Sequence, residues 1–172
     1  MSSWSRAAFL SVVLAAAAVS GVVSGVVVAA SAQTAKAIPK GWFLHEELAP
    51  SLDLAFYEPT HVSFSVSCTK GYADAVLAYR PEGKGPEGKG PEGKKPMKLV
   101  LSRGAASVTI DATGQMFNGS YVIDGPTTMT PALADLLQGG FTLTVDGKEI
   151  KTYATTDQDR AHVRKLTQAC RA

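Results

Sequence analysis

The sequence lacks an excess of charge of either sign. Among 172 residues, 17 are Lys or Arg and 15 are Asp or Glu, so the formal net charge is +2. A protein that captures nucleic acid through its phosphates needs a concentrated basic face. We therefore expect no nucleic-acid partner. The length suits one domain with its own core better than two.

Sequence motifs of common enzyme and metal sites are also lacking. The three histidines, His45, His61 and His162, stand at no metal-ligand spacing with a second His, a Cys or a carboxylate. The chain contains no Gly-x-Ser-x-Gly, phosphate-loop or dinucleotide-binding pattern. Ser67 and Lys70 match a Ser-x-x-Lys pattern, but this serine ends an expected strand, and the spacing brings the two side chains together only on a helix. We therefore assign no catalytic, cofactor-binding or metal residue, and we expect no cofactor.

Charged residues are almost absent from the first 32 positions, where Arg6 is the only one. Residues 7–30 form an unbroken run of apolar and small residues, which ends in Ala30-Ser31-Ala32. Signal peptidase reads small residues at these positions, so we predict a signal peptide over residues 1–32, cleaved between Ala32 and Gln33. The run is longer than a usual signal core, so an uncleaved membrane anchor is the alternative, and a membrane is a partner only in that case.

Cysteine is scarce, since only Cys68 and Cys170 occur. An even, minimal count in an exported chain is typical of one disulfide, although two buried free thiols are the alternative. Cys68 falls on the apolar face of a strand, and Cys170 follows Val163 and Leu166 at helical spacing. We therefore expect a Cys68–Cys170 bridge and an oxidising compartment, either periplasmic or extracellular.

Residues 41–172, after a flexible tether at 33–40, are expected to form a single β-rich domain. The clearest strand spans 61–68, where apolar residues alternate with Ser63, Ser65 and Ser67 and so predict one core face and one hydroxyl-rich face. Further strands are predicted at 52–57, 73–80, 97–103, 106–115, 121–124, 141–145 and 149–153. Asn118-Gly119 and Asp146-Gly147 predict hairpin turns between their flanking strands.

Two helices are predicted among these strands. Thr130-Pro131 opens a short helix with leucines on one face, and Gly139-Gly140 ends it. A second helix spans 157–170. The fold class is therefore α+β and β-rich: an antiparallel sheet or sandwich with a short helix, and a C-terminal helix tied to it by a disulfide.

A Pro-Glu-Gly-Lys-Gly repeat fills residues 81–96. It has no apolar side chain to bury, so it cannot offset the entropy of ordering, and we expect a disordered loop that the fold tolerates as an insertion. Its lysines could touch an anionic polymer or lipid surface, but its glutamates cancel most of that charge.

Two groups of residues suit either a site or a structural role. Asp157 and Asp159 could act as an acid–base pair or bind a cation, but carboxylates at a helix start more often cap it. Four aromatic residues could line a groove, although in a β-rich domain such residues more often build the core: Trp42, Phe43, Phe56 and Tyr57.

The pattern of short motifs resembles that of a group of small, functionally uncharacterised exported proteins of Gram-negative bacteria. The shared features are the signal peptide, an aromatic residue followed by Pro59, the Phe64-Ser65-Val66-Ser67-Cys68 strand, the Leu136-Leu137-Gln138-Gly139-Gly140 helix end and the closing Cys170. The resemblance covers most of residues 42–170, and the repeats depart from it. It implies a periplasmic, disulfide-bonded domain and carries over no active site.

These observations favour a non-enzymatic exported domain that binds an envelope component, either a polymer or a protein. One alternative is an envelope hydrolase or transferase whose site comes from distant residues, for which His45, His61 and Ser67 are the most suitable parts. Another is a membrane-anchored structural protein, which requires that residues 7–30 stay attached.

Overall fold

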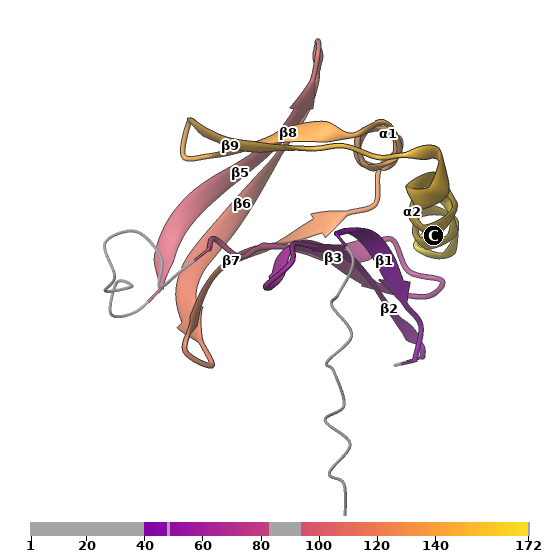
Figure 1. The fold of residues 1–172 in the computed structure, drawn as a ribbon, viewed down its shortest axis with the longest axis horizontal. Coiled ribbons are helices and arrows are strands. Elements are labelled where there is room, and N and C mark those ends of the chain that lie inside the picture. Colours follow the sequence, from indigo (N-terminus) through magenta and orange to yellow (C-terminus); the bar gives the residue numbers. More distant parts are fainter. Residues whose placement is uncertain (1–39, 48, 83–93, 172) are drawn as a thin grey trace, which may run out of the picture. The chain divides into compact units, whose positions relative to one another are not determined.

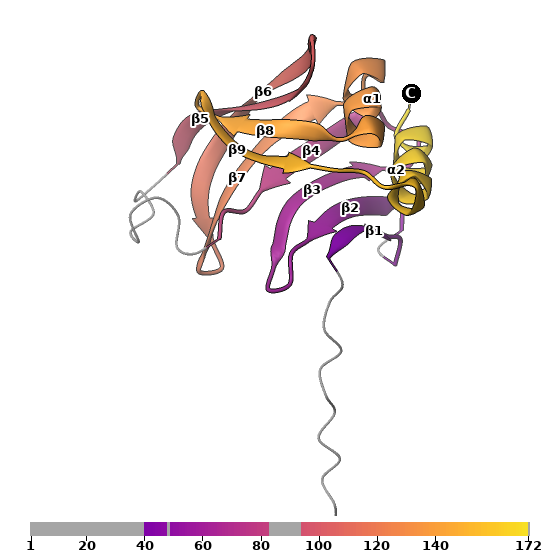
Figure 2. The same ribbon diagram turned by 45° about the horizontal axis from the view of Figure 1, so that its top comes forward.

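Nine antiparallel strands form one continuous sheet in the computed structural model of this protein, which describes residues 40–47, 49–82 and 94–171. Neighbouring strands follow the order β1-β2-β3-β4-β7-β6-β5-β8-β9 (Figures 1 and 2). The elements are β1 (Gly41–His45), β2 (Ser51–Tyr57), β3 (Val62–Thr69), β4 (Asp74–Tyr79), β5 (Lys95–Arg103), β6 (Ala106–Phe117), β7 (Ser120–Thr128), α1 (Pro131–Gly139), β8 (Phe141–Val145), β9 (Lys148–Tyr153) and α2 (Asp157–Ala169).

The alternation of side chains along β3 explains how the sheet separates its two faces. Phe64, Val66 and Cys68 are buried in the core, whereas Ser65 and Ser67 lie on the opposite face. β4 pairs with β3 without a register shift, and so does β2 as far as Phe56. Because both strands also bury alternate apolar residues, the core face extends across the three strands. The predicted division into an apolar and a hydroxyl-rich face is therefore confirmed for Ser65 and Ser67, but it is wrong for Ser63, which is buried and lines a different cavity.

The two predicted hairpin turns are also confirmed. Asn118-Gly119 joins β6 to β7, and Asp146-Gly147 joins β8 to β9. All four residues have positive φ angles between 47° and 81°, as a two-residue type I′ turn requires.

Gly125 in β7 marks the point where the sheet folds over. Residues 113–117 of β6 pair with β7, whereas residues 106–112 of β6 pair with β5 alone. A Cβ atom at Gly125 would collide with the carbonyl oxygen of Asp111 and the Cα of Ala112, so the absence of a side chain lets the strands approach closely. As a result, β8 and β9 lie on the opposite side of the core from β1, β2 and β3 (Figures 1 and 2).

The two helices cover one end of this curled sheet (Figure 2). Thr130 caps α1 as predicted, because its Oγ1 accepts a hydrogen bond from the Leu133 N–H at 3.2 Å, and Pro131 stands in the first turn. The apolar face of α1 is buried in the core, as are Val163 and Leu166 of α2.

The Cys68–Cys170 disulfide joins β3 to the C-terminal end of α2 across a sequence separation of 102 residues. This bond and the curled antiparallel sheet confirm the predicted fold class. Of the two architectures expected, the structure has the single sheet and not the sandwich, because the strands form one continuous hydrogen-bonded order. The disulfide indicates an oxidising compartment.

Strand β1 was not predicted as a strand. It has only five residues, and both of its faces carry apolar groups, so it shows no polar alternation. Trp42 points into the core, and its Nε1 donates to the carbonyl oxygen of Ala154 at 3.1 Å. Strand β1 therefore forms because a tertiary partner fixes its register against β2.

The predicted repeat loop over residues 81–96 extends two residues too far at its C-terminal end. Lys95 and Pro96 belong to β5 and pair with Gly114 and Thr113 of β6. Proline is tolerated at this position because β5 pairs with β8 only from Leu99 onward. The N–H group that Pro96 lacks is therefore not needed for hydrogen bonds to β8. Residues 83–93, the signal peptide with its Ala32–Gln33 cleavage position, and the tether up to residue 39 lie outside the described residues.

Candidate functional site

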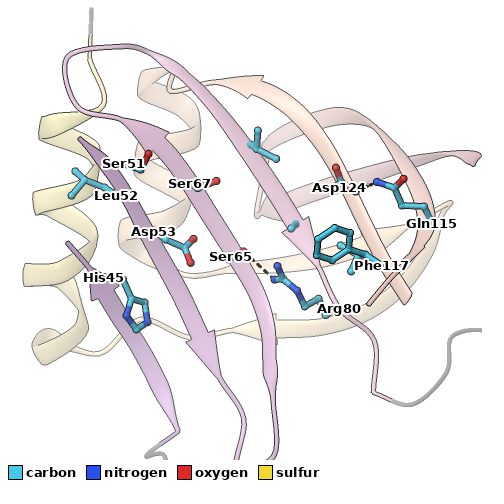
Figure 3. Close-up of a pocket in the computed structure, with 13 residues that line it drawn as sticks. His45, Ser51, Leu52, Asp53, Ser65, Ser67, Arg80, Gln115, Phe117 and Asp124 are labelled. Atoms are coloured by element: carbon cyan, nitrogen blue, oxygen red, sulfur yellow. Dashed lines mark hydrogen bonds between the residues drawn. The ribbon is translucent and has the colours of Figure 1, made fainter. Parts of the chain in front are cut away.

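The sheet face that points away from the core is hollowed into a groove of ≈ 440 Å³. Figure 3 shows the groove with its lining side chains, which come from β1, β2, β3, β4, β7, β6 and the residue that follows β4. Eight of them carry polar side chains: His45, Ser51, Asp53, Ser65, Ser67, Arg80, Gln115 and Asp124.

Small side chains of the central strands line the middle of the groove. Ser65 and Ala78 are Cα partners on β3 and β4, and both are buried although they lie on the outer face. Ala55, the partner of Ser65 on β2, is buried too. Because none of these side chains projects far, the larger side chains around them shape a hollow.

Asp53 is the most perturbed ionisable group of the groove. It stands between His45 and Ser67, which are its Cα partners on β1 and β3. Burial raises the pKa of its carboxyl above the usual value, while the charges of His45 and Arg80 offset part of this rise. Within the described residues its carboxylate forms no hydrogen bond or ion pair, so its lost hydration is not replaced there.

Planar polar groups stand further along the groove. The Nη1 of Arg80 donates to Ser65 Oγ at 3.1 Å, and a guanidinium carries further N–H donors beyond this one. The Nε2 of Gln115 donates to Asp124 Oδ1 at 3.0 Å. These bonds fix the orientation of both charged groups before a ligand arrives.

Two apolar side chains of the groove are well exposed to solvent. Phe117, at the end of β6, is 63% exposed, and Val76 in β4 is 44% exposed. Exposed apolar surface within a polar rim is typical of an interaction site. The groove therefore combines hydrogen-bonding groups with an aromatic platform.

The structure brings two of the three suggested catalytic residues into the groove and separates the third. His45 and Ser67 both line it, whereas His61 lines a different cavity. In a Ser–His–Asp triad the histidine contacts the serine, but here the strand of Asp53 lies between them. Their backbones are two strand spacings apart, about 10 Å, and His45 Nε2 instead lies 2.9 Å from the hydroxyl of Tyr57.

Other catalytic arrangements of these residues do not form. Lys70 lies in the turn after β3, so the Ser-x-x-Lys pattern is not on a helix. The backbones of Asp53 and Asp124 stand three strand spacings apart, about 14 Å across the sheet. The Asp124 carboxylate is instead held by the side-chain amide of Gln115.

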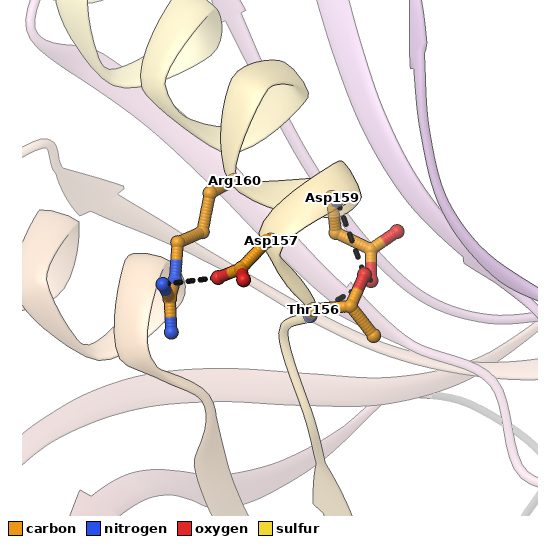
Figure 4. A network of polar contacts seen from close by, with 4 residues as sticks. All are labelled: Thr156, Asp157, Asp159 and Arg160. Atoms are coloured by element: carbon orange, nitrogen blue, oxygen red, sulfur yellow. Dashed lines mark hydrogen bonds and ion pairs between the residues drawn. The ribbon is translucent and has the colours of Figure 1, made fainter.

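Asp157 and Asp159 act as structural groups at the start of α2 (Figure 4). The Asp159 N–H donates to Thr156 Oγ1 at 3.3 Å, and Asp159 Oδ2 accepts from the Thr156 N–H at 3.0 Å, which is a capping box. Asp157 pairs with Arg160 one turn along the helix. The favoured interpretation of both residues as helix-start groups is confirmed.

The four aromatic residues of β1 and β2 divide between the two faces of the sheet. Trp42 and Phe56 are buried in the core, where their ring centroids lie 5.2 Å apart with the edge of one facing the other. Phe43 and Tyr57 pack in the same way on the outer face, with centroids 5.4 Å apart. The hydroxyl of Tyr57 also forms the hydrogen bond to His45 Nε2 described above, so it holds His45 at the edge of the groove.

Neither a metal cluster nor a membrane-spanning helix is found in the part of the chain that the structure describes. No three His, Cys, Asp or Glu side chains gather there in a metal-binding arrangement. No helix there is long and apolar enough to cross a bilayer.

Compared with protein-family models, with curated proteins and with solved structures, the chain matches none.

Sequence reasoning did not identify Asp53, Arg80, Gln115 or Asp124 as site residues. They come from β2, β6, β7 and the residue that follows β4, and only the sheet order brings them to one face. One weak local signal was available, because Asp53 is the only charged residue of the β2 strand. Leu52 and Leu54 on either side of it point into the core, so the sequence alone is equally typical of a solvent-facing carboxylate.

Proposed function

We propose that this protein is an exported binding domain and that its groove holds a glycan chain of the cell envelope. The observation that carries the proposal is the desolvated carboxylate of Asp53, which has no partner among the described residues and lies in a groove with an exposed aromatic ring. A hydroxyl of a ligand that donates to this carboxylate would restore the interaction that burial removes.

The shape and chemistry of the groove fit a hydroxyl-rich chain. The groove extends across six strands, which is about 24 Å at the usual strand spacing, so it suits an extended ligand better than a compact one. Carboxylate, guanidinium and amide groups can each make two parallel hydrogen bonds with neighbouring hydroxyls. Phe117 offers a flat apolar surface for the C–H face of a sugar ring.

The arrangement supports binding better than hydrolysis. His45 and Ser67 are held apart by the strand of Asp53, and the Asp124 carboxylate already accepts a hydrogen bond from Gln115. Phe117 and Val76 contribute contact area and no reactive group.

The expected location agrees with such a ligand. The disulfide indicates an oxidising compartment, and the expected signal peptide over residues 1–32 would deliver the domain there. We propose a periplasmic or secreted location, where envelope glycans are within reach.

The test is a titration of the purified protein with soluble envelope glycan fragments, followed by calorimetry. We expect Phe117→Ala and Asp53→Asn each to weaken binding by about tenfold or more, because one removes the aromatic platform and the other the charged acceptor. The control for Phe117→Ala is Tyr72→Ala, because Tyr72 is equally exposed at 62% but lies outside the groove lining.

The same experiment distinguishes the alternatives. If Tyr72→Ala weakened glycan binding as much as Phe117→Ala does, the groove would not be the glycan-binding site. Retention of an envelope protein, and not of glycans, by the same groove residues would replace the glycan with a protein partner. Release of cleaved glycan that stops in Ser67→Ala or His45→Ala would show an enzyme and refute a pure binding role.

A further inference from the structure

A second cavity, separate from the groove, lies where the edge strand β9 approaches the turn between β2 and β3. Its volume is ≈ 420 Å³, which is within the range of small-molecule sites. Its lining combines apolar surface from Pro59 and Ile150 with polar groups from Ser63, Tyr153 and Lys151. It shares only Arg80 with the lining of the groove.

Three polar atoms of this cavity are buried without a hydrogen bond within the described residues: the hydroxyls of Tyr153 and Ser63, and Glu58 Oε1, which forms an ion pair with Lys151. Tyr153 is 0% exposed and Ser63 is 4% exposed, and neither Tyr153 Oη nor Ser63 Oγ has a partner within the described residues. Burial raises the pKa of Tyr153, and the neighbouring Ser63 hydroxyl offsets part of this rise without forming a bond of good geometry. Tyr153 therefore keeps its proton at neutral pH and is a donor that lacks an acceptor.

A β-bulge accounts for the position of Ser63. The register between β2 and β3 shifts at Phe56/Tyr57, so that Phe56 pairs with Phe64 and Tyr57 with Val62, which leaves Ser63 as the extra residue. Ser63 therefore lines the second cavity, while Ser65 and Ser67 line the groove. Bulges of this kind often redirect a side chain beside a functional site.

Around these hydroxyls three cationic groups, Lys151, Arg80 and the nearby Lys40, face the two carboxylates of Glu58 and Glu82, so positive charge exceeds negative charge by one. Glu58 pairs with both Lys151 and Lys40, the latter at 3.5 Å, so two ammonium groups share one carboxylate. Burial, and then repulsion from Lys40, lower the pKa of Lys151. A ligand anion near Lys151 would compensate both effects. Lys151 also lies over the rings of Phe56 and Tyr153, which holds its ammonium group at the cavity.

We propose that this cavity binds a small organic carboxylate, with the anionic group accepting hydrogen bonds from Tyr153 Oη and Ser63 Oγ beside Lys151 and the apolar body against Pro59 and Ile150. This site is separate from the groove and does not depend on its function.

The probe is benzoate, and its neutral control is benzamide, which has the same shape. We expect the full-length protein to bind benzoate in calorimetry at pH 7 with a dissociation constant below about 1 mM, an affinity that about nine non-hydrogen atoms can reach in a fitting site. Benzamide should bind about tenfold more weakly or worse, because it lacks the charge.

Three variants test the contacts. Tyr153→Phe and Ser63→Ala each remove one donor, and Lys151→Met keeps the apolar stem while removing the charge, so each should weaken benzoate binding about tenfold. Tyr72→Phe removes a hydroxyl that lies outside the cavity lining and should leave benzoate binding unchanged. Phe117→Ala in the groove should also leave it unchanged, which keeps this test independent of the glycan test.

The proposal is overturned by either of two results. One is the absence of benzoate binding up to about 10 mM, far above the affinity expected for a site of this kind. The other is benzoate binding that is matched by benzamide or unaffected by both Tyr153→Phe and Ser63→Ala, in which case ordered water satisfies the hydroxyls and no anion site exists.

Discussion

Reduction of the Cys68–Cys170 disulfide should destabilise the domain strongly, because the bond closes most of the described chain into one loop. The two cysteines are 102 residues apart. In the chain-entropy model, a loop of this length restricts the unfolded state by about 4.7 kcal/mol, and measured values for such bonds are often smaller. Both sulfur atoms lie in the core, so reduction itself leaves the core volume nearly unchanged.

The expected change in melting temperature follows from this value. For a domain of this size, 1 kcal/mol corresponds to about 3–5 °C, so loss of the full ~4.7 kcal/mol should lower the melting temperature by about 14–24 °C. The loss should begin at one place, since the bond holds the end of α2 against β3, and α2 packs on β1 and β2.

Differential scanning calorimetry with and without a phosphine reductant measures this effect. The control is the Cys68→Ala/Cys170→Ala variant, which the reductant should not shift. Hydrogen exchange should show β1 and α2 losing protection before the central strands do. If the reduced and oxidised proteins melt within about 1 °C of each other, the bridge does not stabilise the fold and the reasoning from loop closure is wrong.

Three further predictions concern single residues. Burial raises the pKa of Asp53 in the folded state, so the folded state binds this proton more tightly than the unfolded state does, and ionisation of the carboxyl costs stability above the folded pKa. Asp53→Asn should therefore raise the melting temperature at pH 7. This gain should shrink as the pH falls through the folded pKa. Gly125→Ala should destabilise by about 1–3 kcal/mol in urea unfolding, because its Cβ meets the β6 backbone, which cannot move aside; an unchanged midpoint would contradict the close strand crossing. Thr156→Ala removes the α2 cap and should cost about 1 kcal/mol in the same assay, with Thr155→Ser, which keeps a hydroxyl, as a mild comparison.

Local patterns were sufficient to predict most elements of the fold. Asn-Gly and Asp-Gly specify turns with positive φ, and Thr130-Pro131 begins a helix, because each pattern acts through neighbouring residues. The serine alternation in β3 similarly follows from the two-residue period of a strand.

The order of the strands could not be predicted in the same way. β4 pairs with β7 and β5 pairs with β8, and these pairings join segments separated by whole hairpins. The fold-over at Gly125 depends on an absent side chain, which looks in the sequence like any other glycine. β1 depends on the contact of Trp42 with Ala154, more than 100 residues away.

The candidate sites were less predictable than the fold. Asp53 and Arg80 approach each other only after β2, β3 and β4 pair, and Ser63 turns toward Tyr153 only because of a bulge. Such juxtapositions depend on register, which periodicity alone does not determine.

The positions of β4 and β5 in the sheet bear on the Pro-Glu-Gly-Lys-Gly repeat that separates them in sequence. These strands are not neighbours, since β4 lies between β3 and β7, and β5 between β6 and β8. The repeat therefore does not set the register of any hairpin. Because each unit corresponds to a whole number of codons, slippage during DNA replication could add or remove one without changing the reading frame. We expect alleles that differ in repeat number to encode the same sheet, the same groove and the same disulfide.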